Sequence, residues 1–207
     1  MFLATAQPFG TGAGIPSDGK RFWALLRGDP GARSAAALAA LAGSVTSGTR
    51  PRDWDRGLLD LAAAVREPPA FRLESATLLF LHALDLGDRS AARAQIEQIQ
   101  RLLPSVPRWL RAEAAAEAAF WFARFEKDAE TAGEFLRDVR GGLGEPYRLL
   151  RAQAAVLVQR GDLEAARATL DRARVALERG VGQPSMLDRE LIDAVARDLE
   201  PRQTGAG

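Results

Sequence analysis

The stretch Gly87-Asp88-Arg89-Ser90-Ala91-Ala92-Arg93-Ala94 returns further along the chain as Gly161-Asp162-Leu163-Glu164-Ala165-Ala166-Arg167-Ala168. A degenerate copy, Lys127-Asp128-Ala129-Glu130-Thr131-Ala132, lies between the two. Asp88 and Asp128 are 40 residues apart, and Asp128 and Asp162 are 34 residues apart. Repeats of this length are typical of two-helix units that stack on one another. The sequence therefore predicts an all-α fold of stacked helical hairpins, arranged as a solenoid.

Each copy of the motif is predicted to form the turn between the two helices of a hairpin. The expected first helices are Phe71–Leu86, Arg108–Phe125 and Glu145–Arg160, and the expected second helices are Asp88–Leu103, Asp128–Val139 and Asp162–Arg179. At the start of a helix an Asp carboxylate accepts an unpaired backbone N–H and meets the positive end of the helix dipole, which explains the repeated Asp without invoking chemistry. The alanines at 92, 132 and 166 are expected where the paired helices approach most closely.

The remaining residues predict further helices on either side of the repeats. Residues 1–16 are expected to be an irregular arm, and residues 17–67 an N-terminal helical subdomain with helices at Ser17–Arg27, from Pro30 to about Val45, and at Trp54–Val65. The hairpins and a final amphipathic helix, Pro184–Leu199, occupy residues 68–200, and the last helix is expected to cap the final hairpin. Residues 201–207 are predicted to be a disordered tail.

The composition excludes several classes of function. Lys and Arg together number 28 and Asp and Glu 27, so the net charge of +1 creates no global field that would attract nucleic acid or an anionic membrane. The absence of cysteine excludes disulfides, thiolate metal sites and cysteine nucleophiles, and there is one histidine. No signal peptide or bilayer-spanning stretch is recognisable. We expect a soluble, cytoplasmic protein of bacterial origin, since arginine greatly outnumbers lysine and alanine is abundant.

The repeat region, about residues 71–179, resembles the tetratricopeptide repeat. The resemblance rests on the small residue before the turn and on the Gly-Asp turn itself, whereas most of the aromatic positions of that family carry other residues. It implies a superhelix of hairpins whose first helices line a concave surface for a protein or peptide partner.

A second resemblance lies near the N-terminus. Three stretches are similar to the C-terminal end of the catalytic core in bacterial site-2-type intramembrane zinc metallopeptidases: Pro8-Phe9, Ile15-Pro16-Ser17-Asp18-Gly19-Lys20-Arg21-Phe22-Trp23-Ala24-Leu25-Leu26-Arg27-Gly28 and Arg50-Pro51-Arg52-Asp53-Trp54. By that resemblance Asp18 matches a zinc-ligand position, although Thr5 stands where the family has Asn. The His-Glu-x-x-His helix is absent, so Asp18 lacks the partners that would complete a metal site.

Three other polar residues are predicted to have structural roles. His82 lies within the apolar segment Leu78–Leu84, with no second His or Cys close to it in the sequence, and is expected to be a hydrogen-bonded packing residue. Glu113 and Glu117, one helical turn apart, are expected to lie on a solvated face rather than to act as paired carboxylates.

The candidate binding residues are those that the predicted concave surface would carry: Glu117, Trp121, Arg124, Arg148 and Arg151. For Trp121, packing between the repeats and contact with a ligand are both open alternatives. Arg binds carboxylates in a bidentate fork and Trp supplies buried area, so this groove is expected to favour an extended peptide with carboxylates and an apolar anchor. Replacing Arg148 and Arg151 by Ala is then expected to weaken partner capture with little effect on stability.

The sequence therefore predicts a non-catalytic protein-interaction or regulatory module, with no catalytic residues, no metal site and no cofactor. By the second resemblance, it is the soluble C-terminal tail of a site-2-type metallopeptidase. The alternative is a C-terminal fragment or degenerate relative of such an enzyme whose catalytic half is missing from this sequence. The expected partner is a protein or peptide and not a nucleic acid, with any membrane association arising through that partner.

Overall fold

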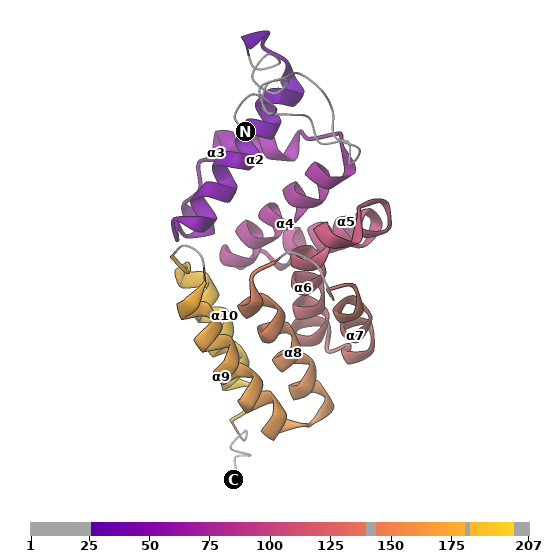
Figure 1. Ribbon diagram of the computed structural model, residues 1–207, viewed down its shortest axis with the longest axis vertical. Helices are drawn as coiled ribbons and strands as arrows, with labels where there is room; N and C mark the ends of the chain where they lie inside the picture. Colours follow the sequence, from indigo (N-terminus) through magenta and orange to yellow (C-terminus); the bar gives the residue numbers. More distant parts are fainter. Residues whose placement is uncertain (1–25, 140–143, 181–182, 201–207) are drawn as a thin grey trace, which may run out of the picture. The chain divides into compact units, whose positions relative to one another are not determined.

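The computed structural model describes residues 26–139, 144–180 and 183–200. Within these ranges the secondary structure is helical and contains no strand (Figure 1), which confirms the predicted all-α class. The predicted arm at 1–16, the predicted tail at 201–207 and most of the predicted helix Ser17–Arg27 lie outside the described residues.

The chain divides into two compact units. The first comprises residues 1–44 and 51–107, and the second comprises residues 45–50 and 108–207. The predicted boundary after residue 67 is therefore not where the units separate. The reason is that α4 (Pro69–Asp85) packs on α3 (Arg56–Ala63) and on the 3-10 turn η1 (Pro51–Asp53), which joins the first predicted hairpin to the N-terminal helices.

The first unit also contains most of α2 (Pro30–Thr46), helix α5 (Arg89–Leu102) and the short 3-10 turn η2 (Leu103–Ser105). Helix α5 packs along α4. The turn η1 is fixed by the end of α4. Backbone N–H of Arg52 donates to the buried Asp85 carboxylate at 2.9 Å, and the guanidinium of Arg52 pairs with the same group. His82 Nδ1 lies 2.7 Å from the carbonyl oxygen of Pro51, and its ring stacks near Trp54. The predicted packing role of His82 is thus confirmed.

The second unit contains the later helices of the chain: the 3-10 turn η3 (Arg108–Leu110), α6 (Ala112–Trp121), a π-helical turn η4 (Phe122–Glu126), α7 (Ala129–Asp138), α8 (Pro146–Arg160), α9 (Leu163–Arg179) and α10 (Met186–Arg197). The predicted helix Arg108–Phe125 is therefore a 3-10 turn, an α-helix and a π turn in succession. Helix α8 is central, since it packs against α6, α7, α9 and α10 (Figure 1). Helix α10 also packs against α9.

The repeated turns have the conformation and the caps that the sequence predicts. Gly87 and Gly161 have φ angles of 74° and 79°, in the left-handed region that favours glycine, and Lys127 adopts a φ of 59° at the same place in the degenerate copy. The aspartate that follows each of them caps the next helix through its side-chain oxygen: Asp88, Asp128 and Asp162. The alanines at the predicted close contacts are fully buried: Ala92, Ala132 and Ala166.

The segment at residues 45–50 is held by the residues that precede and begin α10. Backbone N–H of Gln183 donates to the carbonyl oxygen of Thr46 at 2.9 Å. Gly48 has a φ of 75°, and a Cβ atom there would lie only 2.9 Å from the carbonyl oxygen of Gln183. Arg50 forms two parallel hydrogen bonds, of 2.9 and 2.8 Å, with the carboxylate of Glu190. This short segment therefore belongs structurally to the second unit.

Candidate functional site

Three of the predicted groove residues lie in the interior of the second unit rather than on an open surface. The side chains of Glu117 and Arg151 are 0% exposed and that of Arg148 is 2% exposed. Arg151 Nη2 lies 2.5 Å from Glu117 Oε2, and Arg148 Nη1 lies 3.2 Å from Glu117 Oε1. The prediction of a solvated Glu117 and of an open groove is wrong here, because paired charges can be buried together where a single charge could not.

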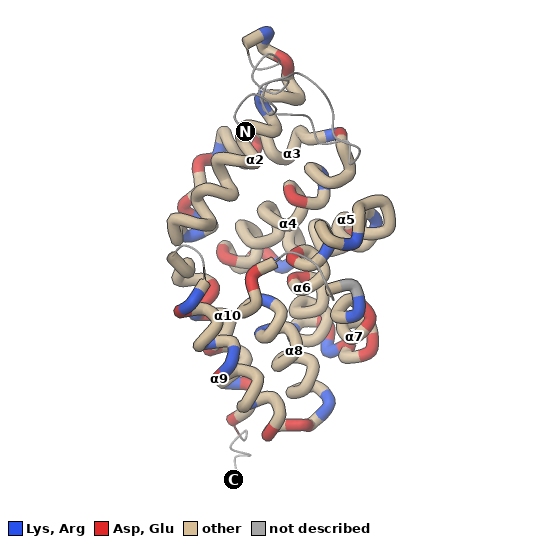
Figure 2. The backbone as a smooth tube through the Cα atoms, in the orientation of Figure 1, with Lys and Arg blue, Asp and Glu red and all other residues tan. Residues whose placement is uncertain are grey.

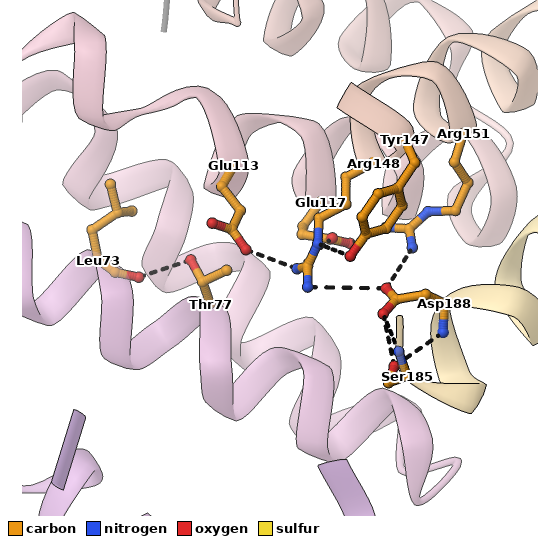
Figure 3. Close-up of polar contacts among 9 residues, drawn as sticks. All are labelled: Leu73, Thr77, Glu113, Glu117, Tyr147, Arg148, Arg151, Ser185 and Asp188. Carbon is orange, nitrogen blue, oxygen red and sulfur yellow. Dashed lines mark hydrogen bonds and ion pairs between the residues drawn. The ribbon is translucent and has the colours of Figure 1, made fainter. Parts of the chain in front are cut away.

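Two further carboxylates complete this group of charges (Figure 3). Glu113, which is 43% exposed, lies 2.8 Å from Arg148 Nη1. Asp188, at the start of α10, places Oδ1 3.9 Å from one nitrogen of each guanidinium. We call the five residues the buried ion cluster: Glu113, Glu117, Arg148, Arg151 and Asp188. The cluster links α6, α8 and α10 within the second unit.

The second oxygen of Asp188 is committed to the N-terminus of its own helix. It accepts hydrogen bonds from the backbone N–H of Ser185 at 3.2 Å and from the Ser185 hydroxyl at 2.7 Å, while the Ser185 hydroxyl accepts from the Asp188 N–H. This reciprocal capping box fixes the orientation of the carboxylate. Asp188 therefore cannot turn to form a close hydrogen bond with either arginine.

The electrostatics of the cluster keep Arg148 charged. Burial acts to lower the pKa of Arg148, but the negative charges of Glu113, Glu117 and Asp188, together with Tyr147, hold it well above its ordinary value. A guanidinium in this position is therefore a permanent cation, and it has the role of a structural ion-pair partner rather than of an acid or a base.

Tyr147 lies beside the cluster, and its hydroxyl accepts a hydrogen bond from Arg148 Nε at 3.1 Å. Burial raises the pKa of Tyr147 to about 12, and the positive charge of Arg148 acts in the opposite direction. The phenol therefore stays protonated at neutral pH. It fills space and accepts a hydrogen bond, without the lowered pKa that a phenolate nucleophile or base would need.

Arg151 is only partly satisfied. One of its nitrogens bonds Glu117, and its guanidinium carbon lies 4.4 Å from the centre of the Phe120 ring. Its Nε and Nη1 atoms are buried and make no hydrogen bond in the structure. A buried donor without a partner costs about 1–3 kcal/mol, so this arginine retains the capacity to bind a further acceptor.

The other two predicted groove residues are also engaged within the second unit. Trp121 is buried, stacks on Phe125 with ring centres 4.7 Å apart, and donates its indole N–H to Glu126 at 3.1 Å. Of the two alternatives for Trp121, packing is therefore the one the structure contains, and the predicted ligand-facing role is wrong. Arg124 is 22% exposed and forms an ion pair of 3.1 Å with Asp198.

The zinc-ligand resemblance of Asp18 falls outside the described residues and stays a prediction. Within the described ranges, no group of three or more His, Asp or Glu side chains is arranged to hold a metal ion. In the buried ion cluster, guanidiniums stand between the carboxylates. Guanidiniums between carboxylates form ion pairs, so this arrangement is not that of a ligand set.

An open groove of about 680 Å³ lies along α8 and α9 in the second unit. Its floor is apolar and includes Leu150, Ala176 and Val175, the last of which is 49% exposed. We call it the α8–α9 groove, and its full lining is Glu145, Pro146, Leu150, Asp171, Arg172, Val175, Ala176, Arg179 and Gly180. Neither Arg172 nor Arg179 has an ion-pair partner among the described residues.

The sequence analysis predicted neither the α8–α9 groove nor the contact of α10 with the buried ion cluster, although the sequence contains indications of both. Asp188 lies on the same helical stripe as Leu191, Ile192 and Val195, and an acidic residue on an apolar stripe indicates a buried partner. Val175 shares a face of α9 with Arg172 and Arg179, and this face is not the one that α9 uses for the helix contact within the hairpin. The prediction assigned the arginines of α8 to an open groove, and although it included a final capping helix, it did not place the carboxylates of α6 and α10 against these arginines.

None of the described helices combines the length and the apolarity needed to cross a membrane. Acidic and basic residues are interspersed along the helices of the second unit (Figure 2). Comparisons of the chain with protein-family models, with curated proteins and with solved structures found no match in any of the three.

Proposed function

We propose that this chain is a non-catalytic helical-repeat module that binds a protein partner, and that the α8–α9 groove is its binding surface. The observation that carries the proposal is the groove itself, an open apolar depression of about 680 Å³ flanked by charged side chains. Exposed apolar depressions with a polar rim are typical of interaction sites.

The packing within the second unit supports the repeat part of the proposal. Helix α6 pairs with α7 and α8 pairs with α9, and α8 packs on both helices of the preceding pair. In the first unit, α4 and α5 pair across a turn of the same sequence type. Pairs of helices that stack in this way are the arrangement of tetratricopeptide-like repeats, which mostly serve as binding surfaces.

The chemistry of the groove favours a short acidic segment with one large apolar side chain. Val175 and Leu150 offer apolar contact, and Arg172 and Arg179 lie on the same side of α9, two helical turns or about 10 Å apart. Both guanidiniums are available for bidentate binding of carboxylates. Asp171, also at the rim, is already paired with Arg174 at 3.2 Å and so repels an acidic ligand less than a free carboxylate would.

The proposal is tested by selecting peptides from a displayed random library on the full chain and measuring their affinity in solution. The selected peptides are expected to share an apolar residue and at least one acidic residue. Val175→Asp is expected to weaken their binding at least about tenfold, because it places a charge in the apolar contact. Leu163→Asp, at an exposed position of the same helix, is the matched control and should leave binding unchanged.

A second variant tests the charge recognition separately. Arg172→Ala together with Arg179→Ala is expected to weaken binding and to reduce its dependence on salt, with the thermal midpoint unchanged because both side chains are exposed. If the selected peptides bind the Val175→Asp chain as tightly as the wild-type chain, the α8–α9 groove is not the binding surface.

A second proposal concerns the metallopeptidase resemblance. Residues 8–23, which carry most of it, lie outside the described residues. In the described part, Pro51 and Arg52 are bound by the end of α4, a packing role that explains both residues without an enzyme. We retain the proposal that this module is the tail of such an enzyme, and an in-frame upstream region encoding His-Glu-x-x-His and membrane helices would support it.

A further inference from the structure

Helix α10 lies against arginine side chains that come from several other segments of the second unit. We call these residues the arginine surface: Arg50, Arg124, Arg148, Arg151 and Arg174. Each acidic residue from the start of α10 to just beyond its end pairs with this surface: Asp188, Glu190, Asp193 and Asp198. The charge of α10 is therefore complementary to that of the surface beneath it.

The apolar side of α10 is equally matched to its surroundings. Leu191, Ile192 and Val195 are buried, as is Leu187 next to the cluster. The hydrophobic spacing is that of an amphipathic helix bound in a groove, where side chains at i, i+4 and i+8 anchor one face. The arginine surface thus binds the acidic residues of α10, which is an amphipathic helix.

We propose that the arginine surface is a binding site for an acidic amphipathic helix of a partner protein, and that α10 occupies this site within the chain until such a helix replaces it. The site is separate from the α8–α9 groove, and this inference does not rest on the function proposed for that groove. It predicts a partner of defined chemistry: a helix with an apolar stripe and carboxylates spaced along one edge.

One of the ion pairs that hold α10 is weak. The pair between Asp193 and Arg174 joins side chains that are 58% and 48% exposed, and a pair of this kind contributes about 0–1 kcal/mol. At the buried end, Asp188 stays 3.9 Å from both Arg148 and Arg151 because its other oxygen is held in the capping box. A carboxylate free of that constraint can form the close bidentate bond that Asp188 does not.

Arg151 offers donors to such a carboxylate. Its Nε and Nη1 atoms have no hydrogen-bond partner although the side chain is fully buried. A carboxylate that approaches Nη1 more closely than Asp188 does removes the cost of one unsatisfied donor, which gives it an advantage over α10 at this end of the site.

When α10 leaves, the charges that remain in the buried ion cluster are equal in number. Without Asp188, the cluster retains two arginines and two glutamates, Glu113 and Glu117, in contact with one another. Detachment of α10 therefore leaves no uncompensated buried charge, which is the usual reason why breaking a buried ion pair is strongly destabilising.

The first experiment measures whether α10 opens independently of the rest of the chain. The chain has no cysteine, so Ala194→Cys in α10 and Ala173→Cys in α9 each create a single buried thiol in the full-length protein. The rate at which a thiol reagent labels each variant reports local opening. We expect the thiol at 194 to be labelled at least about tenfold faster than the thiol at 173. Equal rates would overturn the proposal, since α10 would then open only with global unfolding. Hydrogen exchange of α10 and α9 amides in the wild-type chain gives the same comparison without substitution.

The second experiment supplies a helix in trans. The probe is a fluorescent synthetic peptide of residues 184–199 of this chain, with blocked ends. Because the site is occupied in cis, the apparent affinity is lowered by the fraction of chains that are closed. We expect weak binding to the wild-type chain and binding at least about tenfold tighter to the Asp188→Asn chain, in which α10 is held less firmly. Saturating peptide should also accelerate labelling at residue 194 and leave labelling at residue 173 unchanged.

Control variants separate the possible outcomes. A peptide with Asn at 188 and Gln at 190 is expected to bind at least about tenfold more weakly, since the carboxylates provide the recognition. Val175→Asp should leave binding of the probe unchanged. A negative result for the arginine surface can therefore be told apart from a negative result for the α8–α9 groove. Labelling at residue 194 that rises with protein concentration, together with a dimer by light scattering, would overturn the partner proposal in favour of exchange of α10 between two copies.

Discussion

The α4–α5 hairpin of the first unit and the α8–α9 hairpin of the second share a turn and a close contact but differ in what their first helix buries. Both turns have a left-handed glycine and an Asp cap, and both second helices place a fully buried alanine against the first. In the middle of α4 the buried polar groups are hydroxyls, and the one buried carboxylate, Asp85, is its last residue. Ser75 donates to the carbonyl oxygen of Ala62 at 2.7 Å, and Thr77 donates within its own helix at 2.9 Å.

In α8 the corresponding interior carries two guanidiniums, Arg148 and Arg151. A hydroxyl is satisfied by a carbonyl oxygen nearby, whereas each arginine needs a carboxylate from another helix, here α6 or α10. The repeated motif therefore determines the turn and the approach of the two helices. It does not determine the chemistry of the face that the hairpin presents to other helices.

The largest expected effect tests that difference directly. Arg151→Met leaves Glu117 buried with one guanidinium fewer, and we expect it to lower the free energy of unfolding by about 3–5 kcal/mol in urea titrations. Adding Glu117→Leu should restore part of the loss, because it removes the poorly paired carboxylate, while Arg148 loses one partner and keeps Glu113. This corrects the expectation that removing these arginines would leave stability unchanged.

The matched variant in the other hairpin is Thr77→Val. It removes one hydroxyl that donates to a backbone carbonyl, so the expected loss is about 0.5–1.5 kcal/mol. A loss from Arg151→Met no greater than that from Thr77→Val would show that the stability of the α8 interior does not depend on pairing each buried arginine with a carboxylate.

The next effect concerns the buried alanine that both hairpins have in their second helix. Ala92→Leu and Ala166→Leu each insert a large side chain where the exposed fraction is 0%, and overpacking costs about 1–3 kcal/mol. We expect comparable losses in the two hairpins, measured as shifts of the urea midpoint at constant m-value. A large loss at one position and none at the other would mean that only one of the two alanines lies at a close contact between the helices of its hairpin.

A smaller effect is expected at the turns. Gly87→Ala and Gly161→Ala place a Cβ atom on residues with positive φ, where nothing else lies within 4 Å, so only backbone strain of about 1–2 kcal/mol opposes them. Gly43→Ala in α2 also meets no neighbouring atom but has no positive φ, and it should instead stabilise by about 0.5–1 kcal/mol. Thermal unfolding of the three variants makes the comparison.

The smallest effect is a dependence on pH. Tyr147 is the one tyrosine in the chain, so tyrosinate absorbance reports it alone, and we expect a midpoint of about 12 in the folded protein. The raised pKa means that the folded state keeps its proton longer than the unfolded state, whose tyrosine titrates near its ordinary value of 10.0. The contribution of Tyr147 to stability is therefore present below pH 10 and is lost as pH rises through about 12, by about 1.4 kcal/mol at pH 11. Tyr147→Phe should lack this step, and a folded-state midpoint near 10 would show that the phenol is solvated.

The elements that sequence reasoning located well are those set by local rules. The caps at Asp88, Asp128 and Asp162 need only the residues three positions on, and the helix ends near them agree with the structure within a few residues. The boundary between the units was misplaced because it depends on which helix α4 packs against. The site was misplaced for a related reason: whether Glu117 meets water or an arginine is decided by residues more than thirty positions away.

Gly48 shows how little a composition can say about tolerance to mutation. Its neighbours Ser47 and Thr49 make the stretch look like an ordinary linker, where sequences usually drift freely. Yet φ at Gly48 is 75° and the carbonyl oxygen of Gln183 occupies the space of a Cβ atom, so two independent constraints exclude every other residue. If all twenty amino acids were introduced at position 48 and folded chains were recovered by protease resistance, glycine should be the residue that survives.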